Sequence, residues 1–157
     1  MSIKALCKRA VVTIQREASI ENAARLMRSA HIGDIVVVDA ADTFRPEGMI
    51  TDRDIALKVV AEGLAPAKTA VAAVMSRPVL TLREDDGFIA ALDKMSARGV
   101  RRAPVVDHDG RLTGLISVDD LVQLFARELA KVGALIRHEL AEEIPQVEIS
   151  VAIEGES

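Results

Sequence analysis

Two short stretches of the sequence place a hydroxyl residue three positions before a carboxylate. They read Gly48-x-x-Thr51-x-x-Asp54 and Gly114-x-x-Ser117-x-x-Asp120. Each stands where an apolar segment runs into an expected helix. A carboxylate held there can accept hydrogen bonds from two vicinal hydroxyls, as nucleotide-binding folds do with a ribose. The hydroxyl and the N–H groups of the helix start can meet a phosphate or sugar oxygen, and the glycine allows a ligand close to the backbone.

The same spacing is also close to a capping box, in which the two side chains only satisfy the first N–H groups of a helix. For a single copy, capping is the more common use of this pattern. Two copies at equivalent points favour a further role, since capping requires neither the glycine nor the duplicated surroundings. Both interpretations remain open from the sequence.

The surroundings of the two stretches are themselves repeated. The segment from Met27 to Asp39 matches the segment from Met95 to Asp107, with a constant offset of 68 positions. The offset between the two glycines is 66, because the first connecting loop is two residues longer. A length change confined to a turn is typical of a tolerated loop insertion. The chain therefore consists mainly of one unit present twice.

Each unit predicts the order strand, helix, strand, strand, helix. The helices follow Ser19 in the first unit and Asp85 and Asp86 in the second, with apolar residues on one face. The second strands cover 35–38 and 104–106, and Asp107-His-Asp-Gly110 is a strong turn signal. After residue 118 the last helix continues, a further helix covers 134–143, and alternation over 147–153 is typical of a strand.

These elements predict an α/β (α+β) fold of two pseudo-two-fold related β-α-β-β-α units packed sheet to sheet. Packing is required because a unit of about sixty residues has too small a core alone. The expected organisation is a first unit over 1–62, a linker over 63–73, a second unit over 74–131, and a helix with a possible strand over 132–157. A cleft between the two sheets follows from this arrangement.

Composition excludes several classes of function. A net charge of −4 and an aromatic content of 2% disfavour nucleic-acid binding. Cys7 is the only cysteine, the three histidines have no metal-ligand spacing, and no apolar run reaches the length of a membrane span. No catalytic constellation is visible. The sequence indicates a cytoplasmic protein that is not an enzyme and binds no metal.

The duplicated Gly-x-x-[Ser/Thr]-x-x-Asp pattern, with the Val-Val-Asp turn before it, resembles a tandem pair of CBS domains, the motif named after cystathionine β-synthase. The resemblance covers roughly residues 4–131. It implies a module that binds AMP, ADP, ATP or S-adenosylmethionine as a regulatory ligand in its cleft, without a prosthetic group. It also implies that two such modules pair into a flat, disc-like homodimer.

By this resemblance, the two hydroxyl and carboxylate pairs hold the ribose and the neighbouring phosphate, and two backbone segments line the adenine pocket. Arginines near the cleft are candidate phosphate partners, although ordinary surface arginines are equally consistent with the pattern. The implied site residues of the first unit are Thr13, Ile32, Gly33, Asp34, Ile35, Thr51, Arg53 and Asp54. Those of the second are Thr81, Arg101, Arg102, Ala103, Pro104, Ser117 and Asp120.

The two implied sites differ in one segment. The second has the more typical Ala103-Pro-Val-Val, whereas the first has Gly33-Asp34-Ile-Val, in which Asp34 can repel a phosphate. The second site is therefore favoured. Because Arg101 and Arg102 are adjacent in an extended segment, they point in opposite directions, and one of them faces the cleft.

The function expected from these features is a regulatory module that signals by a change of conformation or of partner, with a protein target that the sequence does not identify. The alternative is a structural or protein-interaction module whose ligand sites have degenerated. The atypical first site and the additional C-terminal segment favour that alternative.

Overall fold

The computed structural model describes residues 2–143 except 9, 40 and 43, with side chains to residue 139. The chain divides into two compact units, Met1–Val122 and Gln123–Ser157. The strand expected over 147–153 lies outside the described residues.

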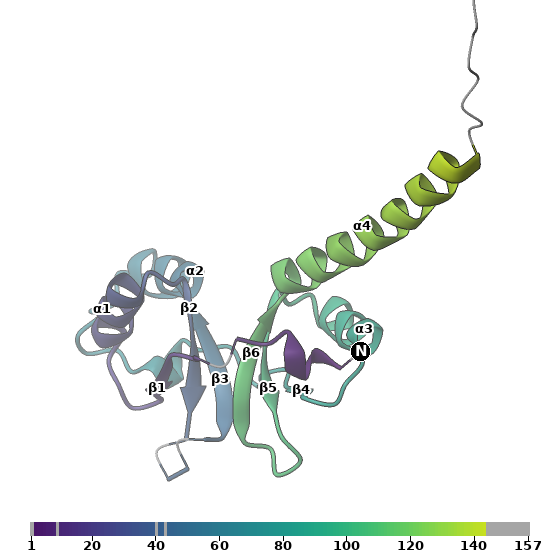
Figure 1. Ribbon diagram of the computed structural model, residues 1–157. Coiled ribbons are helices and arrows are strands. Elements are labelled where there is room, and N and C mark those ends of the chain that lie inside the picture. Colours follow the sequence, from purple (N-terminus) through teal and green to yellow (C-terminus); the bar gives the residue numbers. More distant parts are fainter. Residues whose placement is uncertain (1, 9, 40, 43, 144–157) are drawn as a thin grey trace, which may run out of the picture. The chain divides into compact units, whose positions relative to one another are not determined.

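The elements follow the predicted order twice (Figure 1). The first motif comprises β1 (Thr13–Gln15), α1 (Ile20–Ala30), β2 (Asp34–Val38), β3 (Pro46–Thr51) and α2 (Asp52–Ile55), which continues as a π-helical turn over Ala56–Val60. The second comprises β4 (Leu82–Arg83), α3 (Phe88–Arg98), β5 (Arg102–Val106), β6 (Leu112–Ser117) and α4 (Val118–Glu143). Short 3₁₀ turns cover Ile3–Ala5 and Val71–Ala73. The mixed α/β fold class predicted from the repeat is confirmed.

The helix ends explain why these segments stop where they do. Ser19 caps α1 by accepting a hydrogen bond from the Asn22 N–H at 3.2 Å, as its sequence position predicts. In contrast, the N-cap residue of α3 is Gly87, which has no side chain to cap the helix, so neither acidic residue before it is the cap. Both helices end on a left-handed residue, His31 and Gly99, which turns the chain into the next strand.

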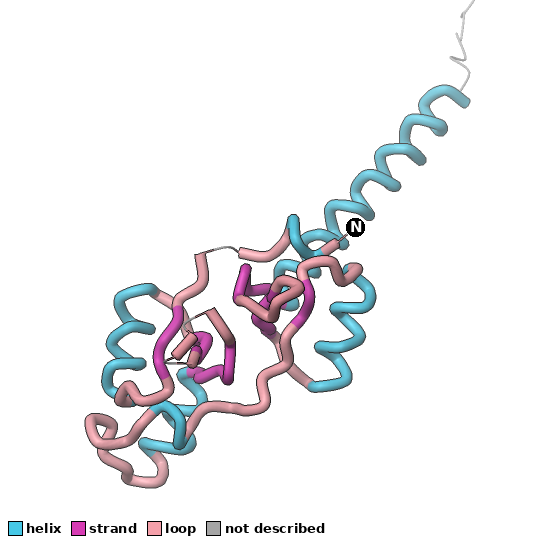
Figure 2. Tube along the Cα trace, turned by 90° about the horizontal axis from the view of Figure 1, so that it is seen from below, coloured by secondary structure: helices cyan, strands magenta, loops and turns pink. Residues whose placement is uncertain are grey.

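The two sheets have the same topology. In each, the first strand pairs parallel to the second, and the second pairs antiparallel to the third. The register is equivalent, because Asp34 lies opposite Thr51 in one sheet and Arg102 lies opposite Ser117 in the other. Within the first unit the sheets lie side by side, with β3 nearest β6, and α1 and α3 lie on the outer sides (Figures 1 and 2).

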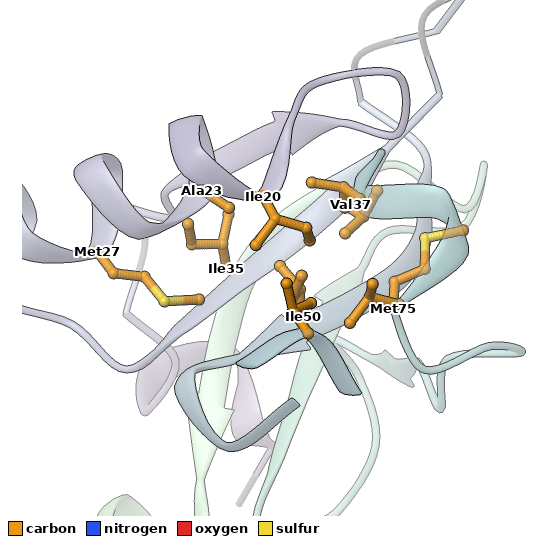
Figure 3. Close-up of a cluster of buried hydrophobic side chains, with 10 residues drawn as sticks. Ile20, Ala23, Met27, Ile35, Val37, Ile50 and Met75 are labelled. Atoms are coloured by element: carbon orange, nitrogen blue, oxygen red, sulfur yellow. The ribbon is translucent and has the colours of Figure 1, made fainter. Parts of the chain in front are cut away.

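Each sheet forms its own core with its helix, and a second buried layer lies on the opposite strand faces. In β2, Ile35 and Val37 belong to the core beneath α1, with Ile20 and Met27 (Figure 3). Val36 and Val38 point to the opposite face and are still at most 2% exposed. Burial on both faces requires a second layer against this sheet, which is the other motif.

Each motif is completed by the segment that leads into the other one. Ile3 is fully buried in the core of the second motif, and Lys8 pairs with Leu115 of β6. Conversely, Val71 and Val74 are buried in the core of the first motif, and Ser76 pairs with Met49. Each packed motif is therefore built from two separate parts of the sequence. The predicted boundaries, in contrast, divide the chain into consecutive segments.

The last helix, α4, is a single 26-residue helix. The sequence predicts a separate helical stretch over 134–143, and the structure joins it to the preceding helix without a break. Across the residues that the structure describes, no helix combines the length and apolar character needed to cross a membrane.

Candidate ligand-binding site

Both strand-to-helix junctions form the same hydrogen-bond cluster. At the first, the Thr51 N–H and hydroxyl donate to Asp54 Oδ2 at 3.1 and 2.7 Å, and the Asp54 N–H donates to the Thr51 hydroxyl oxygen at 3.0 Å. At the second, Ser117 donates to Asp120 Oδ2 from its N–H at 2.9 Å and its hydroxyl at 2.5 Å, and the Asp120 N–H donates back at 3.2 Å. The capping interpretation is therefore realised at both points.

Capping uses only one oxygen of each carboxylate. The other, Oδ1, faces a lysine: Lys58 Nζ lies 2.8 Å from Asp54, and Lys8 Nζ lies 3.9 Å from Asp120. Burial raises the pKa of Asp54, but hydrogen bonds from Lys58 and Thr51 outweigh it and hold that pKa below its ordinary value. A cap and a second hydrogen-bonding role are thus compatible within one side chain.

The glycines of the two motifs lie against the protein's own chain. A Cβ at Gly48 would stand 2.9 Å from the Ser76 carbonyl oxygen, and one at Gly114 would stand 2.7 Å from Cys7 Sγ. These contacts belong to the two segments that complete the opposite motif, residues 3–8 and 71–76, here called the exchanged segments. They hydrogen-bond to β6 and β3 at these points. The close approach that the sequence assigned to a ligand is made here by backbone and side chains of the chain itself.

A cleft of about 450 Å³ opens between the two motifs at the first junction. Thr51 and Arg53 line it from the end of β3 and the start of α2, and Gly33 lines it from the loop before β2. Arg101 and Arg102 come from the equivalent segment of the second motif. The structure thus brings residues of both repeats together, as the pseudo-two-fold arrangement requires.

An ion pair crosses this cleft. Asp34 and Arg102 occupy equivalent positions of the two repeats, and Arg102 Nη1 lies 2.5 Å from Asp34 Oδ1. Positions that meet their own counterpart lie on the pseudo-two-fold axis, where two identical charges would repel. Asp34 is only 8% exposed, and its buried Oδ2 atom has no hydrogen-bond partner among the residues that the structure describes. Burial, the largest influence, raises the pKa of this carboxyl despite the guanidinium beside it.

The pairing refines two sequence expectations. Asp34 was expected to repel a phosphate, and its charge is instead engaged by Arg102. The two adjacent arginines make different contacts, since Arg101 lies 3.8 Å from Asp119, a pair in which both side chains are largely exposed. Both nevertheless line the cleft, so the expectation that only one of them faces it was wrong. A ligand phosphate entering the cleft would have to compete with Asp34 for Arg102.

Several predicted residues lie outside this cleft. The side chains of Ile35 and Ala103 are buried in the two cores, and Pro104 is buried within β5. Thr13 lines a separate shallow depression beside α1, and Thr81, just before β4, is half-buried. Ile32 is half-buried in the loop before β2, where its N–H donates to the Met27 carbonyl.

Neither junction carboxylate, Asp54 or Asp120, is part of the lining of the 450 Å³ cleft. At the first junction Thr51 lines the cleft, whereas at the junction that the sequence favours Ser117 does not. The lining includes residues that sequence reasoning did not select, namely Met49, Asp52, Ser76 and Val100. Ser76 lies at the cleft because its segment, which leads into the second motif, runs beside β3 of the first motif. In the sequence, only Gly48 indicated that another part of the molecule comes close to the backbone there.

Comparison with known proteins identifies the family. The family model described as "CBS domain" matches residues 3–61 and 71–127. The chain therefore belongs to the CBS domain family, with two tandem copies of the domain.

An uncharacterised protein of Methanopyrus kandleri is 35% identical over 124 residues, which are 79% of this chain and 62% of that protein. The chain thus spans less than two thirds of this relative. Among solved structures, a CBS domain protein from Pyrobaculum aerophilum complexed with AMP is 27% identical, with a TM-score of 0.73 over 83% of this chain and 99% of that one. The CBS domain pair of protein MJ0100, in complex with 5′-methylthioadenosine and S-adenosyl-L-methionine, is 28% identical, with a TM-score of 0.71 over 82% and 98% of the two chains.

Proposed function

We propose that this protein is a non-catalytic regulatory module that binds an adenosine-containing ligand between its two CBS domains. The observation that carries the proposal is the duplicated junction, in which each carboxylate caps its helix with one oxygen and holds a second oxygen beside a lysine. Binding of AMP and of S-adenosyl-L-methionine by structural neighbours supports the ligand class. A cytoplasmic setting remains a prediction from composition.

In this proposal the ribose hydroxyls donate to Oδ1 of a junction carboxylate. At the first junction the ligand hydroxyl would take the place of the Lys58 ammonium, which is 49% exposed and can move into solvent. Arg53 and Arg101 are the cations that can meet a phosphate without breaking a buried contact, since Arg102 is held by Asp34.

Signalling would follow from the same ion pair. A phosphate that attracts Arg102 leaves Asp34 buried and without its cation, which is costly unless the two motifs shift or the carboxyl takes up a proton. Ligands with and without a phosphate would therefore stabilise different arrangements of the cleft. A partner that distinguishes these arrangements would receive the signal.

A thermal-shift panel of AMP, ADP, ATP and S-adenosylmethionine tests the proposal. A ligand that binds only the folded chain stabilises it by about 2.7 kcal/mol at a hundred times its dissociation constant. The Asp54→Asn and Asp120→Asn variants, which keep an oxygen for the cap, should lose the shift at whichever junction binds. Absence of any shift at millimolar concentration would contradict an adenosyl site.

A second candidate is a protein-interaction module whose clefts no longer bind ligands. The engagement of Arg102 by Asp34 favours it, because this pair occupies part of the cleft without any ligand. In that case the junction variants would leave every partner interaction unchanged.

A further inference from the structure

One cation of the cleft already has an anionic partner inside the protein. Arg102 Nη1 lies 2.5 Å from Asp34 Oδ1, and the two side chains belong to different motifs. A carboxylate and a phosphate bind a guanidinium in the same way, through oxygen atoms that accept its N–H groups. Asp34 therefore occupies, with an oxygen of the chain itself, a position that a ligand phosphate would otherwise take.

This pair differs in burial from a second ion pair beside it. The Asp34 side chain is 8% exposed, whereas the Asp119 side chain that faces Arg101 is 62% exposed. An exposed pair is weak, because water solvates both partners when they separate. A carboxylate that is almost fully buried has no water to replace its cation. Although both arginines line the cleft, Arg102 is therefore held more firmly than Arg101.

The charges around Asp34 leave Arg102 as its main counter-ion. Burial is the largest influence on the pKa of Asp34, and Arg102 is the strongest influence that opposes it. Asp52 and Lys8 act more weakly and in opposite directions. A ligand phosphate that draws Arg102 away thus leaves a buried carboxylate without its cation, which is costly. A ligand without a phosphate leaves the pair intact.

We propose that Asp34 is an internal competitor of phosphate, so that the cleft at the first junction favours adenosyl ligands without a phosphate over AMP, ADP and ATP. The inference rests on the proposed function, and it names the class of adenosyl ligand and the residue that selects it. A nucleotide binds through the more exposed Arg53 and Arg101, or it separates Arg102 from Asp34. Adenosine requires neither.

Calorimetric titration of the full chain with adenosine and with AMP tests this selection. The wild type should bind AMP no more tightly than adenosine. Asp34→Asn releases Arg102 and should bind AMP at least tenfold more tightly than the wild type, about the ratio that one hydrogen bond to a charged group provides. Its affinity for adenosine should stay within about twofold of the wild-type value.

The matched control is Asp119→Asn, which removes the same charge from the exposed pair with the neighbouring Arg101. Because water already solvates that pair, the affinity for AMP should change by less than about threefold. Adding Arg102→Met to Asp34→Asn should return the affinity for AMP to the wild-type value, since the released guanidinium is then missing. Circular dichroism and thermal unfolding show whether each variant retains the fold.

The possible outcomes distinguish the role of Asp34 from ligand binding itself. Equal affinity of the wild type and Asp34→Asn for AMP, a gain that survives Arg102→Met, or the same gain in Asp119→Asn would overturn the role of Asp34 and leave adenosyl binding intact. A wild type that binds AMP more than about tenfold more tightly than adenosine would overturn it even if Asp34→Asn does not fold. Absence of binding of both ligands to every variant would contradict the proposed function, and this inference with it.

Discussion

The two CBS motifs share one backbone plan and differ in the charges placed on it. Both junctions have the same cap, the same glycine under a crossing segment, and the same register between their strands. At the pseudo-two-fold axis, however, Asp34 stands where the second motif has Arg102. The packing contacts of the two motifs are alike, whereas their axial side chains are complementary.

The lysines at the two junctions differ in the same way. Lys58 lies one turn after Asp54 in the same helical segment, whereas Lys8 reaches Asp120 from the exchanged N-terminal segment. The first contact is local and short, and the second is long-range and 3.9 Å. The first junction is therefore stabilised within its own motif, and the second depends on a distant part of the chain.

The largest effect is expected from substitutions that disrupt the packing shared by the two motifs. Gly48→Ala should lower the free energy of unfolding by about 3 kcal/mol and Gly114→Ala by about 1 kcal/mol, the upper and lower range for overpacking. The nearest atom at both positions is a side-chain sulfur, Met75 Sδ at 2.8 Å from the Cβ of Gly48→Ala and Cys7 Sγ at 2.7 Å from that of Gly114→Ala. The less movable backbone oxygen is closer at Gly48, where Ser76 O lies at 2.9 Å, than at Gly114, where Lys8 O lies at 3.1 Å. Denaturant unfolding measures both.

The control for this pair is Gly87→Ala, because a Cβ there has no neighbour within 4 Å. Because Gly87 is the N-cap residue of α3, where glycine is preferred to alanine, its loss should be that of a weakened cap, at most about 1 kcal/mol. Equal losses at all three positions would mean that the crossing segments do not require the glycines.

An effect of intermediate size is expected at the pseudo-two-fold axis, where the side chains of the two motifs differ. Arg102→Met leaves the buried Asp34 carboxylate without its cation, and we expect a loss of about 2 kcal/mol at pH 7, reduced from the value for a fully buried pair because Arg102 is 44% exposed. Asp34→Asn removes the buried charge instead and should cost less. Since burial already raises the pKa of Asp34, protonation should shrink the Arg102→Met loss as the pH falls. A larger loss in Asp34→Asn than in Arg102→Met would contradict this view of the pair.

The smallest expected effect concerns the two helix caps, whose contributions to stability should differ in size and in pH dependence. The pKa of Asp54 is lower in the folded chain than its ordinary value of 3.8, so its contribution is fully present above that value and is lost as the pH falls through the folded pKa. Asp54→Asn should therefore cost about 1 kcal/mol at pH 7 and almost nothing once the pH has fallen below the folded pKa. Asp120→Asn should cost less at pH 7, because Lys8 is more distant. A pH-independent difference between wild type and Asp54→Asn would refute the role of Lys58.

The sequence predicted the repeat, the order of elements and both junctions, because these depend on local periodicity and on residue types at fixed spacing. The comparison of Gly33-Asp34-Ile-Val with Ala103-Pro-Val-Val was shifted by two positions, because the strand register makes Asp34 equivalent to Arg102, as the constant offset of 68 requires. The sequence did not reveal that these two residues meet, since contact across an axis is a property of the assembled pair.

The positions of the exchanged segments could also not be predicted from local sequence patterns. Ile3 and Val71 are short apolar signals far from the cores they complete, and only tertiary packing assigns each to the other motif. For the same reason the sequence could not predict that Ser76 would line the cleft beside Thr51.

Calorimetric titration of the wild type with AMP and with 2′-deoxy-AMP tests most directly whether junction carboxylates hold a ribose. The deoxy ligand lacks one of the two hydroxyls that would donate to Asp54 or Asp120. A hydrogen bond to a charged group contributes about 1.5 to 3 kcal/mol, so 2′-deoxy-AMP should bind at least tenfold more weakly than AMP. Equal affinities for the two nucleotides, or no binding of either at millimolar concentration, would contradict the account.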